Sequence, residues 1–226
     1  MKMFLGNTKL IAGIILAALF ISACTSREEK VAETIKNEMF KNLYDFESYQ
    51  PIETKIDTLR RDKYGDTLIY DNIMLIKAAS DEFDKAKGNF DEQKEICEIY
   101  MPTYYSSSTS DKKFYAARDK AKDAYNDMTF YLGIMDSLTT DIKTKVKDCD
   151  NNQYGWFVTH KFRCKTKGGN STIGTYYYFM DKDCERIIRR FDEDEMSLEQ
   201  YHHWIDNALE VSDDEGTKEK SDSKEK

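Results

Sequence analysis

The sequence has three histidines. They are the first residues to consider for chemistry, because histidine serves both as a general acid or base near neutral pH and as a metal ligand. His202 follows Glu199 by three positions, and a helix would place both side chains on one face, as in di-metal carboxylate bundles. Such a bundle needs a second Glu-x-x-His pair, and the sequence contains none. We therefore expect no metal site, and an ordinary polar helix surface at Glu199 and His202.

His160 belongs to a segment in which apolar residues recur at every second position. Trp156, Val158 and Phe162 share its predicted strand face, which favours a buried structural histidine. An enzyme with a site assembled around His160 from distant carboxylates is the alternative. The sequence has no glycine-rich phosphate loop and no Gly-x-Ser-x-Gly elbow. We expect a protein that is not an enzyme, with no catalytic residue and no cofactor.

Cys97, Cys149, Cys164 and Cys184 are the cysteines that follow Cys24. An exported protein can form disulfides, and four cysteines can pair in three ways. The predicted strand order puts Cys149 and Cys184 at one end of a sheet and Cys164 at the other. A Cys149–Cys184 disulfide is therefore the favoured bridge, and four unpaired thiols are the alternative.

The N-terminal residues have the pattern of an export signal. Lys2 and Lys9 precede an apolar stretch, 10–21, that is too short for a stable membrane span. The sequence Ile21-Ser22-Ala23-Cys24 resembles the lipobox of bacterial lipoproteins. The resemblance implies that signal peptidase II removes residues 1–23 and that Cys24 carries a lipid containing palmitate. A plain secretory signal or an uncleaved anchor is the alternative.

The predicted lipid would attach the mature chain to the outer membrane, on its periplasmic or its surface face. Residues 24–30 would form a polar tether. Removal of residues 1–23 takes away two lysines and no acidic residue, which leaves 32 basic and 42 acidic side chains and a net charge of −10. This charge argues against nucleic acid as a partner, because phosphates need basic surfaces. Residues 211–226 have the composition of a disordered charged tail.

Changes of hydrophobic period divide the remaining chain into elements. Residues 31–43 have helical spacing, residues 49–59 alternate as a strand, and three further strands joined by turns occupy 156–191. Ser197 and Gln200 form a capping box that begins a last helix. These elements predict an α+β fold with a small antiparallel sheet of about four strands and packed helices.

Two long heptad patterns in residues 66–147 interrupt the strands. Apolar residues recur seven apart in 69–97 and again in 114–142, and Pro102 with three serines separates the two patterns. This spacing predicts an inserted long antiparallel helical hairpin with coiled-coil packing. We expect residues 31–210 to form a single domain that includes this insertion.

Three short segments resemble small uncharacterised envelope lipoproteins of Gram-negative anaerobes. The segments are Tyr49-Gln50-Pro51-Ile52-Glu53, the strand 158–163 and the turn 180–183. In that group we expect a short loop where this chain has residues 66–147. The resemblance implies no particular activity.

The expected function is binding or assembly in the cell envelope, with a protein or a glycan as partner. Tyr100, Tyr104 and Tyr105 fall at the predicted hairpin tip, where aromatic side chains can contact either partner. The alternative is a glycan-binding accessory lipoprotein in which aromatic side chains of the sheet stack on sugar rings. These side chains are Trp156, Tyr176 and Tyr178. The sheet face that the helices cover distinguishes the two hypotheses.

Overall fold

The computed structural model describes residues 26–210, so the predicted signal peptide, Cys24 and the tail 211–226 lie outside the described residues. The fold is α+β with a four-stranded antiparallel sheet, as the sequence predicts. The elements in chain order are α2 (Arg27–Asn42), a 3-10 turn (Phe46–Ser48), β1 (Gln50–Arg60), α3 (Thr67–Ile99), α4 (Ser108–Lys147), β2 (Gln153–Lys165), β3 (Ser171–Asp181), β4 (Ile187–Asp192) and α5 (Leu198–Glu210). No helix in this range is long and apolar enough to cross a membrane.

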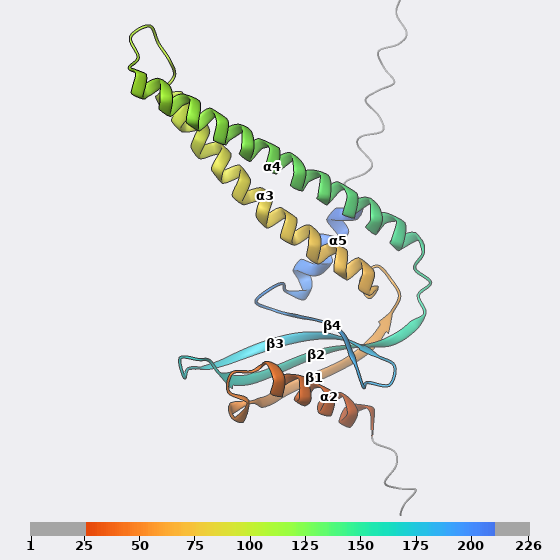
Figure 1. Ribbon diagram of the computed structural model, residues 1–226. Coiled ribbons are helices and arrows are strands. Elements are labelled where there is room, and N and C mark those ends of the chain that lie inside the picture. The colour runs from red at the N-terminus through yellow and green to blue at the C-terminus, as the bar shows by residue number, and fades with distance from the viewer. Residues whose placement is uncertain (1–25, 211–226) are drawn as a thin grey trace, which may run out of the picture. The chain divides into compact units, whose positions relative to one another are not determined.

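The chain forms two compact units. Of the described residues, the sheet unit consists of 26–60 together with Gln153–Met196, and it contains α2 and the four strands. The helix unit consists of Arg61–Asn152 and the described residues 197–210, and it contains α3, α4 and α5 (Figure 1).

The sheet has the strand order β1-β2-β3-β4, so β1 pairs with the first strand of the meander. Ile56 lies opposite Val158 in this antiparallel pairing. A β-bulge between Pro51 and Glu53 shifts the alternation at the start of β1. Ile52 is therefore exposed, although its sequence position predicts the same face as Ile56.

Helix α2 covers one face of the sheet (Figure 1). Ser26 and Glu29 form a capping box at its start, with Glu29 N donating to Ser26 Oγ at 3.2 Å. The buried side of α2 includes Ile35 and Met39, which pack against apolar side chains of the strands. Because of the capping box, the helix begins within the predicted tether 24–30 and not at the end of it.

In the helix unit, α3 and α4 lie side by side (Figure 1). Asn72 Nδ2, near the start of α3, donates to Asp141 Oδ2, near the end of α4, at 2.7 Å. At the other ends, Cys97 Sγ lies 3.8 Å from the carbonyl oxygen of Phe114. The two helices therefore run in opposite directions. Small buried side chains between them allow close packing, and these are Ala79, Ala86, Ala117 and Ala124.

Helix α5 contacts both α3 and α4. Its predicted capping box is confirmed, because Gln200 N donates to Ser197 Oγ at 3.2 Å and Ser197 N donates to Gln200 Oε1 at 2.9 Å. Tyr201 and Ile205 are buried, and the ring of Tyr201 lies 5.8 Å from that of Tyr70. Helix α5 is thus the third helix of this unit.

Candidate functional site

Residues 99–110, which we call the tip segment, join α3 to α4. Ser107 is the N-cap of α4, and its Oγ accepts a backbone N–H of the first turn at 3.2 Å. Ser106 N donates to the carbonyl oxygen of Thr103 at 3.0 Å, and Ser106 Oγ donates to Asp111 Oδ1 at 2.6 Å. These hydrogen bonds fix the turn and join it to the first turn of α4.

Tyr104 and Tyr105 have the most exposed large side chains of the tip segment. They are 95% and 90% exposed, and their ring centroids are 5.2 Å apart in an edge-to-face arrangement. Ile99 and Met101 are also exposed, at 67% and 61%. The sequence predictions did not include these two residues. A lack of charge could have identified them in the sequence. The tip segment has no charged side chain, whereas 34% of the residues of the whole chain are charged.

Tyr100 differs from the other two tyrosines predicted at the tip. Lys113 Nζ donates to the Tyr100 hydroxyl at 3.1 Å and lies 4.6 Å from the centroid of the Tyr100 ring. Tyr100 is partly buried and is the C-cap of α3, with its backbone N–H donating to the carbonyl oxygen of Ile96 at 3.0 Å. Tyr100 therefore has a role within the fold, and Tyr104 and Tyr105 are the fully exposed pair.

The sheet aromatics proposed to stack on glycans lie on the face that α2 covers. Tyr178 is fully buried, and Trp156 and Tyr176 are half-buried against the same core. The indole N–H of Trp156 donates to the carbonyl oxygen of Lys182 at 3.0 Å, and the guanidinium of Arg27 lies 4.2 Å from the Trp156 ring. These side chains do not form an open stacking surface, because α2 packs on this face.

His160 is a buried residue of the same core, with 2% of its surface exposed. Its Nε2 lies 2.8 Å from the Tyr49 hydroxyl and its Nδ1 lies 2.8 Å from Thr54 Oγ1. Burial lowers the pKa of His160 to about 4, so the ring is neutral near pH 7. Both ring nitrogens are occupied by hydroxyl groups, and no carboxylate of residues 26–210 hydrogen-bonds to the ring. This geometry is that of a structural histidine.

Tyr178 is the one described residue with a buried side-chain polar atom that has no hydrogen-bond partner. The hydroxyl lies in a core formed by residues such as Val158 and Met180. Burial raises the pKa of the phenol, so the group stays neutral. A neutral, buried phenol costs stability and has no nucleophilic character.

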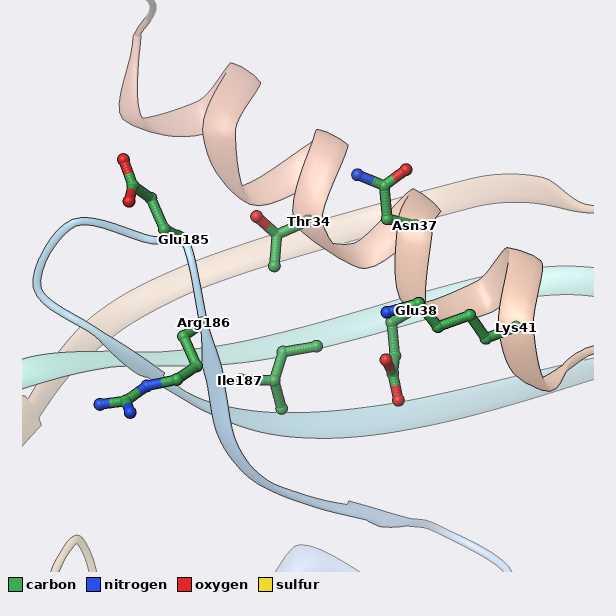
Figure 2. Close-up of a pocket in the computed structure, with 7 residues that line it drawn as sticks. All are labelled: Thr34, Asn37, Glu38, Lys41, Glu185, Arg186 and Ile187. Carbon is green, nitrogen blue, oxygen red and sulfur yellow. The ribbon is translucent and has the colours of Figure 1, made fainter.

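An open pocket of about 340 Å³ lies between α2 and the connection from β3 to β4 (Figure 2). Thr34 Oγ1 donates to the carbonyl oxygen of Cys184 at 2.7 Å and holds this connection against the helix. Charged side chains of both signs line the pocket, among them Glu38 and Arg186. In Figure 2 the Arg186 guanidinium points away from α2 and does not converge with Glu38 on a common point.

A second open pocket, of about 490 Å³, lies beside α5 and includes Glu199 and His202. The ring of His202 lies 4.2 Å from that of Tyr64, and burial lowers the pKa of His202. Asp206 accepts a hydrogen bond from Lys63 Nζ at 2.7 Å, which lowers the pKa of Asp206. Within the described part of the chain, no group of three or more His, Cys, Asp or Glu side chains is placed to hold a metal ion.

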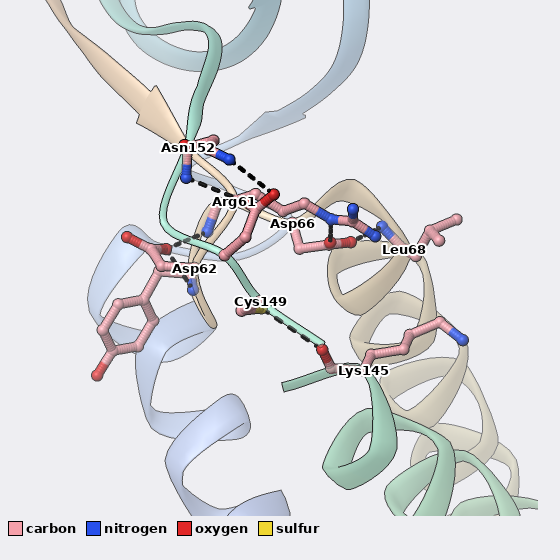
Figure 3. A network of polar contacts seen from close by, with 10 residues as sticks. Arg61, Asp62, Asp66, Leu68, Lys145, Cys149 and Asn152 are labelled. Carbon is pink, nitrogen blue, oxygen red and sulfur yellow. Dashed lines mark hydrogen bonds and ion pairs between the residues drawn. The ribbon is translucent and has the colours of Figure 1, made fainter. Parts of the chain in front are cut away.

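A polar network surrounds the start of α3 in the helix unit (Figure 3). Asp66 is buried and accepts from Arg61 Nε at 3.0 Å and from Leu68 N at 2.8 Å. Arg61 N also donates to the carbonyl oxygen of Asn152 at 2.9 Å. This hydrogen bond joins the first and last residues of the segment Arg61–Asn152. Asp66 is therefore a paired helix cap, which accounts for a buried acid without a catalytic role.

Cys149 and Cys184 are separate thiols, so the favoured disulfide is not formed in the structure. Cys149 Sγ donates to the carbonyl oxygen of Lys145 at 3.5 Å in the helix unit, whereas Cys184 is buried beneath α2 in the sheet unit. Burial raises the pKa of both thiols, so neither is an activated nucleophile.

Comparisons with protein-family models, with curated proteins and with solved structures find no match. His160, Trp156 and Asp66 are each engaged inside the fold. Large apolar side chains are also exposed elsewhere in the described residues, among them Phe40, Tyr44 and Phe130. The tip segment stands out because it has the two most exposed, Tyr104 and Tyr105.

Proposed function

We propose that the protein is a lipid-anchored, non-enzymatic component of the bacterial cell envelope. In this proposal Cys24 attaches the mature chain to the outer membrane. Helices α3 and α4 act as an antiparallel hairpin that presents the tip segment to a binding partner.

One observation carries the binding role, namely the exposure of Tyr104 and Tyr105 at 95% and 90% in a segment without charged residues. Large aromatic side chains contribute most of the free energy at binding surfaces. A non-catalytic role is supported by His160, which is neutral and enclosed by Tyr49 and Thr54. The sheet alternative for glycan binding has little support, because α2 covers Trp156 and Tyr178.

The anchor is tested by the Cys24→Ser variant of the full chain, expressed in a Gram-negative bacterium with labelled palmitate. We expect the wild type to carry the label and to fractionate with membranes, and the variant to lose both properties. Cys97→Ser is the matched control, because it removes a cysteine of the helix unit and should leave the label unchanged. A Cys24→Ser protein that still carries palmitate would refute the proposed anchor.

A further inference from the structure

We infer that the partner of the tip segment is the interface of a lipid bilayer. The inference rests on the proposed function, because it assigns a partner to the same binding surface. It predicts a second, reversible membrane contact besides the covalent lipid at Cys24. Three properties of the tip segment support it, namely its apolar exposure, its lack of charge and the hydrogen bonds that fix its turn.

The exposed side chains of the tip segment are the kinds that enter a bilayer interface. Tyr104 and Tyr105 have an apolar ring and a hydroxyl that can stay at the level of the headgroups, where tyrosine is enriched. Ile99 and Met101 add exposed aliphatic surface beside them. Binding at an interface increases with the apolar area that leaves water.

Residues 99–110 contain no lysine, arginine, aspartate or glutamate. A charged side chain is costly to move into a bilayer, and this segment has none to move. Some polar groups of the turn are also paired before any contact, since Ser106 N donates to the carbonyl oxygen of Thr103, Ser107 Oγ accepts a backbone N–H and Ser106 Oγ donates to Asp111 Oδ1 next to the segment. Paired groups lose less hydration energy on entering an apolar environment.

The residues next to the tip segment favour a zwitterionic lipid surface over an anionic one. Glu98 and Asp111 adjoin its two ends, and Lys112 and Lys113 follow, so charges of both signs are balanced there. Lys113 is also engaged with Tyr100. A polybasic cluster, which anionic lipids require, is absent from this part of the sequence. Binding should therefore depend on apolar contact and not on salt.

The test uses the mature chain with Cys24→Ser, which has no acyl chain of its own, in flotation assays with phosphatidylcholine vesicles. The tip variant carries Tyr104→Ser and Tyr105→Ser. The control carries Tyr115→Ser and Tyr125→Ser, which changes two tyrosines of α4 that are 48% and 58% exposed. We expect the unmodified chain to float with the vesicles, the tip variant to lose binding about tenfold and the control to bind as before.

Addition of phosphatidylglycerol or of salt should change the binding of the unmodified chain little. Equal loss of binding in the tip variant and in the control would overturn the inference, as would flotation that requires anionic lipid and disappears in salt. Absence of flotation would also overturn it and would leave a protein or a glycan as the partner of the tip. Palmitate labelling at Cys24 is measured separately, so failure of the lipid contact is distinguishable from failure of the anchor.

Discussion

His160 lies between two hydroxyl groups in the core of the sheet unit. A neutral imidazole can donate to one of Tyr49 and Thr54 and accept from the other. Its ring also stacks on Phe162, with 5.8 Å between the ring centroids. A proton on the ring would place a charge in these apolar surroundings, so His160 stabilises the fold as the neutral species.

The pH dependence of stability follows from the pKa of His160, which falls from 6.5 to about 4 on folding. Between these values the unfolded chain binds more protons, so the stabilisation is complete above pH 6.5 and is lost as the pH falls toward 4. When the pH is lowered from about 7.5 to about 5, the free energy of unfolding should fall by about 2 kcal/mol more in the wild type than in the His160→Gln variant. Urea unfolding at the two pH values measures this difference. Parallel losses in the two proteins would contradict this expectation.

Replacement of tyrosine by phenylalanine should change the free energy of unfolding in opposite directions at two buried positions. The Tyr178 hydroxyl has no hydrogen-bond partner, whereas the Tyr201 hydroxyl donates to the carbonyl oxygen of Tyr64 at 2.9 Å. Tyr178→Phe should therefore raise the free energy of unfolding by about 1 kcal/mol, and Tyr201→Phe should lower it by about 1 kcal/mol. Denaturant titration measures both, and shifts of the same sign would show that the Tyr178 hydroxyl is paired in solution.

At the scale of elements, local sequence signals predicted the helices well. Heptad spacing within 66–147 anticipates two long helices, and the structure has them at 67–99 and 108–147. The start of β1 was less predictable, because the bulge after Pro51 depends on pairing with β2. A bulge reverses the face of the residues beyond it, and a period-2 pattern in one strand does not contain that information.

The capping box at the start of α5 should contribute measurably to the stability of the fold. Ser197→Ala removes the hydroxyl that accepts the backbone N–H of Gln200, and it should lower the free energy of unfolding by about 1 kcal/mol. Ser137→Ala, on the exposed side of α4, is the control and should have no such effect, because alanine is the better helix former. Thermal unfolding followed by circular dichroism compares the two, and equal melting temperatures would argue against the cap.

At the scale of the whole molecule, the C-terminal helix belongs with helices that are distant in sequence. Helix α5 follows β4 directly, yet its contacts are with α3 and α4. The helix unit is therefore built from Arg61–Asn152 and from residues that the ribosome adds after the whole sheet. Tyr201 and Ile205 are the buried side chains that α5 contributes.

A chain that ends at Met196 should consequently have an unstable helix unit. Loss of α5 removes the buried Tyr201 and Ile205 and should reduce the stability of this unit by at least about 3 kcal/mol. Hydrogen exchange of α3 and α4 measures the effect in the mature chain. A chain that ends at Glu210 is the control and should keep full protection. Unchanged protection after truncation at Met196 would show that α3 and α4 are stable without α5.

The sequence by itself determined the properties that depend on neighbouring residues. These are the helical and strand periods and the capping box at Ser197, which depend on local spacing, and the lack of charge in the tip segment, which depends on local composition. The tertiary structure decided which faces are covered. It placed α2 over Trp156 and Tyr178, enclosed His160 between Tyr49 and Thr54, and left Tyr104 and Tyr105 exposed. Burial depends on contacts between distant segments, so periodicity predicts an apolar face but not the element that covers it.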